Sequence, residues 1–97
     1  MSQAVDIGTL IDRDPRIRGG RPLIAGTGVT VERIVRWYRA GLEPREIAAK
    51  FGHLSVGQVF AALAYWQANR EEIDTDIETD DARAEELERK ARGARSS

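Results

Sequence analysis

Three helical patterns follow one another between residues 30 and 69, and each has its own start or stop signal. In the first, the apolar residues Val31, Ile34, Val35 and Tyr38 recur with the spacing of one face of an α-helix. Thr30 suits the N-cap of this helix, and Gly41 suits the position just after its end. A chain with this patterning can bury its apolar side chains only by packing helix against helix, so we expect a mainly α fold.

The second and third patterns are a short helix and a longer one, separated by a tight turn. Pro44 fits the first position of the short helix, which ends at Gly52. The longer helix opens with an S-x-x-Q capping box made by Ser55 and Gln58. Its apolar stripe is Val56, Val59, Phe60, Leu63 and Trp66. Such a pair is typical of a helix-turn-helix, although an ordinary helical hairpin has the same pattern.

The segment "RIRGGRPLIAGTGVTV" (residues 16–31) is rich in glycine, which suits either a phosphate-binding loop or a hairpin. A Walker A loop is excluded because five residues, not four, separate Gly20 from Gly26, and Thr27 stands where lysine is required. We therefore expect short strands starting near residues 10 and 22, with glycine-containing turns. The predicted fold class is mainly α with a short N-terminal β-hairpin.

Composition excludes several classes of function. The chain has 97 residues, one histidine and no cysteine, so we expect one modest domain without disulfides or a thiolate metal site. His53 has no partner at a metal-ligand spacing, and Asp12 and Asp14 suit a turn better than an acid–base pair. We expect no enzyme activity, no metal and no cofactor. Without a long apolar run or a secretory signal, the expected location is cytoplasmic.

The formal charge is divided between two parts of the chain. Residues 1–70 hold ten Lys or Arg and six Asp or Glu, whereas residues 71–97 hold five and ten. We therefore expect a hairpin and helical domain over residues 1–69 and an acidic C-terminal tail over residues 70–97 that binds a partner. A merely solvated tail is the alternative. Helical periodicity is lost after residue 72, so the tail should be mobile alone, with at most a helix capped by Thr79 or Asp80 and ending before Gly93.

A DNA-binding role would depend mainly on phosphate contacts. The third helix has no Lys or Arg before Arg70, so few of its side chains suit base edges. Basic residues around the hairpin and on the first two helices suit backbone phosphates better. Those around the hairpin are Arg13, Arg16, Arg18 and Arg21. The candidate DNA-binding residues are Arg33, Arg36, Arg45, Lys50, Ser55 and Gln58. Useful specificity would need a dimer or a larger complex. Candidate dimer contacts are Trp37, Tyr65 and Trp66, although core packing explains these aromatic residues about as well.

Over residues 11–66 the chain also resembles the domain of unknown function 433 family of antitoxin-like proteins. The resemblance is carried by the segments 19–27, 41–47 and 54–65, of which the first matches a GGxPxIxGT-like core. One position departs from the family pattern, because Gly28 stands where the family usually has arginine.

The resemblance implies a winged or homeodomain-like helix-turn-helix and the antitoxin half of a VapBC-like toxin–antitoxin pair. The implied partners are a PIN-like ribonuclease toxin, operator DNA and a second copy in a homodimer. The tail would inhibit the toxin, with apolar anchors and basic side chains that enter the acidic metal site. These candidate toxin-binding residues are Ile73, Ile77, Leu87, Arg89, Arg92 and Arg95. The alternative function is a protein-interaction or dimerisation module without DNA binding.

Overall fold

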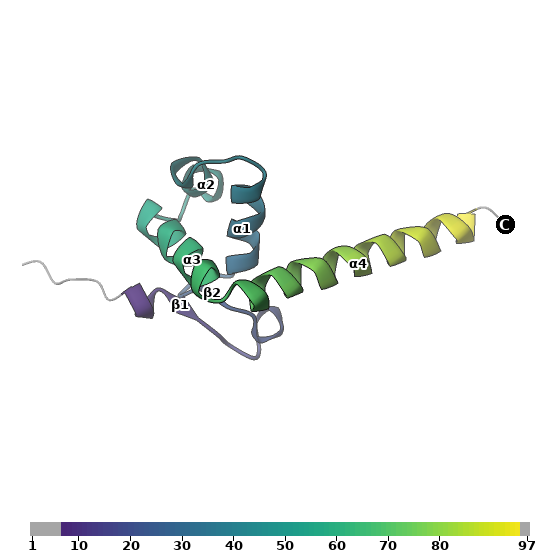
Figure 1. Ribbon diagram of the computed structural model, residues 1–97, viewed down its shortest axis with the longest axis horizontal. Helices are drawn as coiled ribbons and strands as arrows, with labels where there is room; N and C mark the ends of the chain where they lie inside the picture. The colour runs from purple at the N-terminus through teal and green to yellow at the C-terminus, as the bar shows by residue number, and fades with distance from the viewer. Residues whose placement is uncertain (1–6, 96–97) are drawn as a thin grey trace, which may run out of the picture.

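The computed structural model describes residues 7–95, which form four helices and a two-stranded antiparallel sheet (Figure 1). The fold is therefore mainly helical with a short hairpin near the N-terminus, as the sequence predicted. The strands are β1 (Ile11–Asp12) and β2 (Leu23–Ile24), and the helices are α1 (Val31–Arg39), α2 (Pro44–Phe51), α3 (Val56–Ala68) and α4 (Arg70–Arg95).

The ends of the first three helices follow the predicted capping signals. The Thr30 hydroxyl accepts a hydrogen bond from the Arg33 backbone N–H at the start of α1. Gly52 ends α2 with φ +75°, in the left-handed region that favours glycine. At the start of α3, Ser55 and Gln58 make both hydrogen bonds of a capping box. Local hydrogen bonding thus fixes where these helices begin and end.

The hairpin pairs Ile11 with Ile24 and Asp12 with Leu23. Gly26, at φ +78°, allows a second tight turn in which the Thr27 N–H donates to the Ile24 carbonyl at 3.0 Å. The glycine-rich segment therefore turns the chain, as expected, and leads directly into α1.

Helices α1, α2 and α3 pack around a common apolar core together with β2, and we call this unit the head. The stripe predicted for α3 is only partly correct, because Val59 and Trp66 are buried whereas Val56 and Phe60 are 36% and 57% exposed. The reason is that α3 packs on α1 and α2 through one side, which leaves the neighbouring apolar side in solvent. Tyr38, at the end of the α1 stripe, is also exposed at 44%.

Helix α4 overturns the expectation of a mobile tail. It runs without a break through the acidic stretch, and Thr79, Asp80 and Gly93 lie inside it rather than at its ends. Ile73 and Ile77 are 1% and 6% exposed and belong to the core of the head. Tertiary burial therefore stabilises a helix that local propensity alone does not predict.

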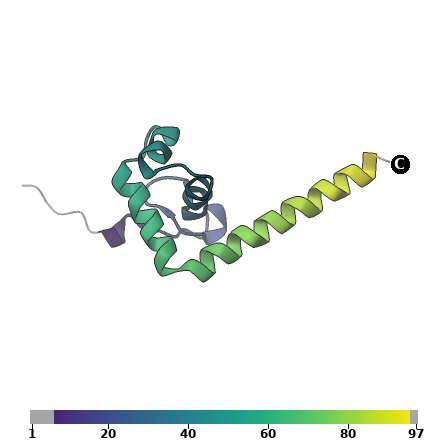
Figure 2. The ribbon, with the colours of Figure 1, turned by 45° about the horizontal axis from the view of Figure 1, so that its top comes forward.

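Beyond the head, α4 projects into solvent (Figure 2), and the described molecule measures 68 × 28 × 22 Å. Every residue from 81 to 94 is exposed. In residues 7–95 no single helix is long and apolar enough to cross a membrane. The pair α2 and α3 passes that test only when taken together across its 117° bend.

Candidate functional site

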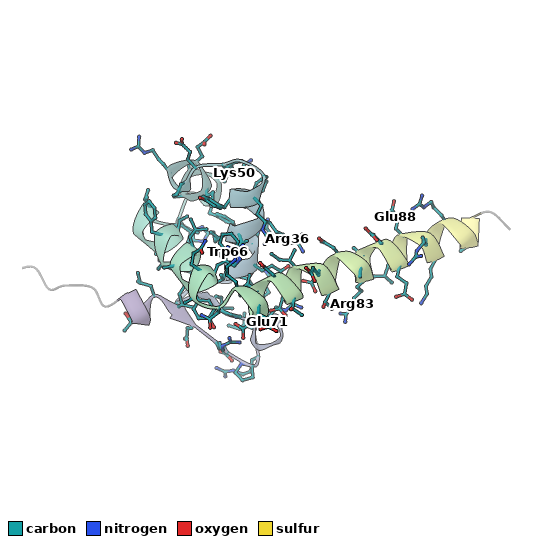
Figure 3. The ribbon with its side chains drawn as sticks, viewed as in Figure 1. Arg36, Lys50, Trp66, Glu71, Arg83 and Glu88 are labelled. Atoms are coloured by element: carbon teal, nitrogen blue, oxygen red, sulfur yellow. The ribbon has the colours of Figure 1, made fainter. Side chains whose placement is uncertain are left out.

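Four ion pairs join the head to the first part of α4, and we call them the ion-pair seam. Arg36 lies beside α4 in Figure 3 and donates to Asp81 at 2.9 Å. The seam consists of Arg13–Glu72, Arg21–Asp80, Arg36–Asp81 and Arg39–Asp74. The basic head and the start of the acidic tail are therefore electrostatic partners of each other. The charge division alone predicted external partners or a solvated tail, and not this contact within the chain.

Glu32 lies at the centre of the seam and is only 9% exposed. Its carboxylate accepts hydrogen bonds from Arg21 at 2.6 Å and from Arg36 at 3.0 Å. Burial and the neighbouring Asp80 carboxylate raise the pKa of Glu32, whereas the hydrogen bond from Arg21 lowers the pKa of Asp80. A buried carboxylate between two guanidinium groups ties α1 to the hairpin and to α4.

The aromatic residues predicted for a dimer contact are engaged inside the chain instead. The Trp66 indole is buried and donates to Asp74 at 2.8 Å. The Tyr65 hydroxyl donates to Glu72 at 3.1 Å, and that hydrogen bond adds to the Arg13 pair. Trp37 is half-buried beneath the ammonium group of Lys50, which lies 4.5 Å from the ring centre.

A cavity of about 700 Å³ opens beside the seam, and we call it the arginine cavity. Five arginines and one histidine line it, whereas Glu32 and Asp80 are its only acidic lining residues in the part of the chain that the structure describes. The start of α1 forms another part of the wall, at Val29 and Thr30. The basic lining residues are Arg18, Arg21, Arg33, Arg36, His53 and Arg83. Its charge suits an anion.

On another side of the head, exposed apolar side chains surround a groove of about 730 Å³, and we call this the apolar patch. Phe60 is its most exposed large side chain, and Glu43 and Arg45 stand beside it. The apolar members are Tyr38, Leu42, Pro44, Val56 and Phe60. A surface of this kind suits a protein contact better than a polar nucleic-acid backbone.

The six predicted DNA-binding residues do not form one surface. Arg33 and Arg36 line the arginine cavity, whereas Arg45 stands beside the apolar patch. Lys50 covers Trp37. The remaining two, Ser55 and Gln58, use their side chains to cap α3.

The predicted toxin-binding residues divide along α4. Ile73 and Ile77 are buried in the head, so in this structure neither is exposed to a partner. Leu87 is 60% exposed and Arg89 is also exposed. Arg92 pairs with Glu88 at 3.6 Å, and the side chain of Arg95 lies outside what the structure describes.

The sequence reasoning missed Arg13, Arg21 and Arg39 as structural partners of the acidic segment. The only signal for them was the opposite net charge of the two parts of the chain. In residues 7–95 no group of three His, Cys, Asp or Glu side chains is placed to hold a metal ion.

Comparison with known proteins identifies a matching family and a similar solved structure. The family described as "Protein of unknown function (DUF433)" matches residues 11–66. The crystal structure of a DUF433 member protein from Anabaena variabilis ATCC 29413 is similar, with a TM-score of 0.67 and 29% sequence identity. That similarity covers 71% of this chain and 68% of the other. Curated proteins give no match. The resemblance over residues 11–66 is thus confirmed, and the antitoxin role stays a prediction.

Proposed function

Since this chain belongs to the DUF433 family of proteins of unknown function, we propose that it is an antitoxin-like binding protein that inhibits a PIN-like ribonuclease. The observation that carries the proposal is the distal half of α4, residues 82–95, which extends from the head and is exposed throughout residues 82–94. A helix that buries so little of its surface in its own chain gains little stability from packing. Covering by a partner protein would supply that stability.

The distal half has one face suited to such a partner. Residues at alternating spacings of three and four continue the face that Ile73 and Ile77 bury in the head. Leu87 is the only large apolar side chain on this face beyond the head, and it would be the anchor of the contact. The exposed members of the face are Ala84, Leu87, Ala91 and Ala94. The small size of the three alanines lets a partner approach the helix backbone closely on either side of Leu87.

Basic side chains of the distal half would add the inhibitory contact. Arg89 and Lys90 lie within one turn of Leu87, and Arg92 follows on the next turn. The PIN-type nucleases implied by the family resemblance hold their metal with clustered carboxylates, which a guanidinium or ammonium group would neutralise. The distal half of α4 would therefore contact the ribonuclease through an apolar anchor, and its basic side chains would enter the acidic metal site.

A truncation tests the proposal if it spares the seam. Ending the chain after Ala82 keeps Ile73, Ile77 and Asp81, so the head should remain folded. We expect the truncated chain to lose inhibition of its proposed PIN-like ribonuclease partner, to be sought in the neighbouring reading frames, while its thermal midpoint stays close to that of the full chain. Full inhibition by the truncated chain would contradict the proposal.

A point substitution gives the matched comparison. Leu87→Glu places a charge on the proposed contact face, whereas Ala82→Glu adds the same charge on the opposite side of the helix. Only Leu87→Glu should reduce ribonuclease inhibition, by about tenfold or more for a central anchor. Equal effects of the two substitutions would show that charge alone, and not this face, determines binding.

Operator DNA binding is a second part of the proposed function. The 117° bend between α2 and α3 supports a helix-turn-helix. However, α3 exposes Val56 and Phe60, and no Lys or Arg lies on it. We therefore place DNA contact on the arginines of α1 and the hairpin, through backbone phosphates rather than base edges.

The alternative, an interaction or dimerisation module without DNA binding, is favoured by the apolar patch. Two copies related by a two-fold axis would bury the apolar members of the patch against each other, with Glu43 and Arg45 at its border available for pairing between copies. Phe60→Asp should then convert a dimer to a monomer in sedimentation velocity, with the off-patch substitution Ala49→Asp as control. A monomeric wild type at high micromolar concentration would exclude this interface.

A further inference from the structure

We infer that the arginine cavity binds a phosphate group of a nucleic-acid backbone. This inference deepens the DNA-contacting part of the proposed function by naming the site and the chemistry that it recognises. It depends on three features of the cavity, namely its unneutralised charge, the helix start in its wall and the conformation of one arginine at its rim.

The charge of the cavity is only partly neutralised inside the molecule. Arg21 and Arg36 are held by Glu32, Asp80 and Asp81. Among the described residues no carboxylate forms an ion pair with the other three arginines of the lining, Arg18, Arg33 and Arg83. Guanidinium groups bind phosphate oxygens in pairs of parallel hydrogen bonds, so three of them around one cavity suit a phosphate.

The start of α1 adds a second source of positive potential. Val29 and Thr30 line the cavity just before the first turn of this nine-residue helix. The Val31 and Arg33 N–H groups already donate to the Pro22 carbonyl and the Thr30 hydroxyl, so the helix start favours a nearby anion through the positive end of its dipole. Glu32 lies in the same turn, but two arginines already hold its carboxylate.

Arg18 reaches the cavity from an unusual backbone conformation. Its φ is +51°, and it is the one described non-glycine residue with positive φ. Its Nε donates to the Gly28 carbonyl at 3.3 Å, which holds the guanidinium across the rim. A strained residue of this kind suggests a functional constraint at its position.

The cavity also has room for more than a single ion. At about 700 Å³ it can take a phosphate together with part of the adjoining sugars. A Cβ atom at Gly28 would meet no atom within 4 Å, and Gly28 is not among the glycines with positive φ. An arginine at this position would therefore fit and add a further cation to the lining.

The test compares full-length variants by fluorescence anisotropy with a labelled duplex from the DNA upstream of the gene, and with a single-stranded RNA of the same sequence. Arg18→Gly removes a charge without adding strain at positive φ, and Arg83→Ala removes one from an exposed helical position. Arg89→Ala is the matched control, because it removes the same charge from the same helix outside the cavity lining.

We expect the Arg18→Gly, Arg83→Ala double variant to bind about tenfold more weakly at low salt. The slope of log affinity against log salt should fall by about one, because the two arginines hold the same phosphate. Arg89→Ala should change affinity less than about twofold, and Gly28→Arg should strengthen binding. The nucleic acid that shows this pattern, duplex DNA or RNA, identifies the source of the phosphate.

Four results would overturn the inference. The first two are no binding of either nucleic acid and equal weakening by Arg89→Ala and the double variant. The others are binding that neither cavity substitution weakens and binding of inorganic phosphate alone. Ribonuclease inhibition by the double variant is measured in parallel. If the double variant still inhibits the ribonuclease and the cavity substitutions do not weaken nucleic-acid binding, the cavity is not the phosphate site. The antitoxin proposal is then unaffected. Binding of DNA that is insensitive to the cavity variants rejects only the site.

Discussion

The proximal half of α4 (residues 70–81) and the distal half (residues 82–95) belong to one unbroken helix but have different surroundings. The proximal half buries Ile73 and Ile77 and supplies every acid of the ion-pair seam. The distal half is exposed over residues 82–94, and the ion pairs Lys90–Glu86 and Arg92–Glu88 join neighbouring turns of the same helix. The first half is therefore part of the head, and only the second is available to a partner.

This difference also changes how the acidic charge is understood. The proximal half holds seven Asp or Glu and one Arg, whereas the distal half holds three acidic and five basic residues. The acidic character of the tail thus lies mainly where the head needs it. The segment proposed to bind the ribonuclease is basic, which suits a site built from carboxylates.

The largest expected difference between the halves concerns the free energy of unfolding. Ile73→Ala should lower it by about 2–4 kcal/mol, because a fully buried side chain is lost and a cavity remains. Leu87→Ala removes a similar side chain from the exposed half and should change it by less than about 0.5 kcal/mol. Urea denaturation measures both. Similar losses for the two variants would show that the distal half also packs on the head.

Local sequence signals account for the features that the sequence predicted correctly. Thr30, Gly52 and the Ser55–Gln58 box act within one helical turn, so their effects can be read from neighbouring residues. The helix around Ile73 could not be found in this way. It depends on burial against residues far away in the chain, in a stretch where Thr and Asp lower intrinsic helix propensity.

The next effect tests the seam. Arg21→Ala should lower the free energy of unfolding by roughly 1–2 kcal/mol, because Glu32 and Asp80 both lose a charged hydrogen-bond donor. Arg45→Ala makes the same truncation outside the seam and should have little effect. Adding Glu32→Gln to Arg21→Ala should recover part of the loss, since the buried charge is then absent. If the changes in the free energy of unfolding caused by the two substitutions are additive, Arg21 and Glu32 do not interact, which would contradict the seam.

The candidate site was less predictable than the fold for a related reason. Arg33 and Arg36 were selected as cations on one helix, and both do line the arginine cavity. Arg18 had the same interpretation as a basic residue of the hairpin suited to phosphate, but Arg83 did not. Their place beside Arg33 and Arg36 could not be predicted from sequence, because the hairpin loop and α4 meet there only after the whole head has folded. Sequence shows which residues carry charge, but not which charges the chain itself neutralises.

A smaller effect is expected from pH, and its sign differs between two ranges. The pKa of Asp80 and that of Glu72 are lowered by Arg21 and Arg13, so their stabilisation is present above their ordinary values and is lost as pH falls through the lowered ones. Glu32 has a raised pKa, so its contribution increases as pH falls through that raised value. Stability should therefore rise slightly from pH 7 to about 5 and fall below about pH 4.

Urea denaturation at several pH values measures this profile, and Glu32→Gln supplies the control. The free energy of unfolding of the variant should no longer rise as pH falls from 7 to about 5. It should still fall below about pH 4, because Asp80 and Glu72 are unchanged. An identical profile in the variant would mean that Glu32 does not titrate between the two arginines as the seam requires.

The smallest effect concerns Gly93, which lies inside the distal half with open space around it. Glycine within a helix costs about 1 kcal/mol relative to alanine, so Gly93→Ala should increase the helical circular dichroism signal of the free protein. It should leave the urea midpoint of the head unchanged, because a projecting segment frays without unfolding the rest. A raised midpoint would mean that the distal half unfolds together with the head, and the division of α4 into a docked half and an available half would then fail.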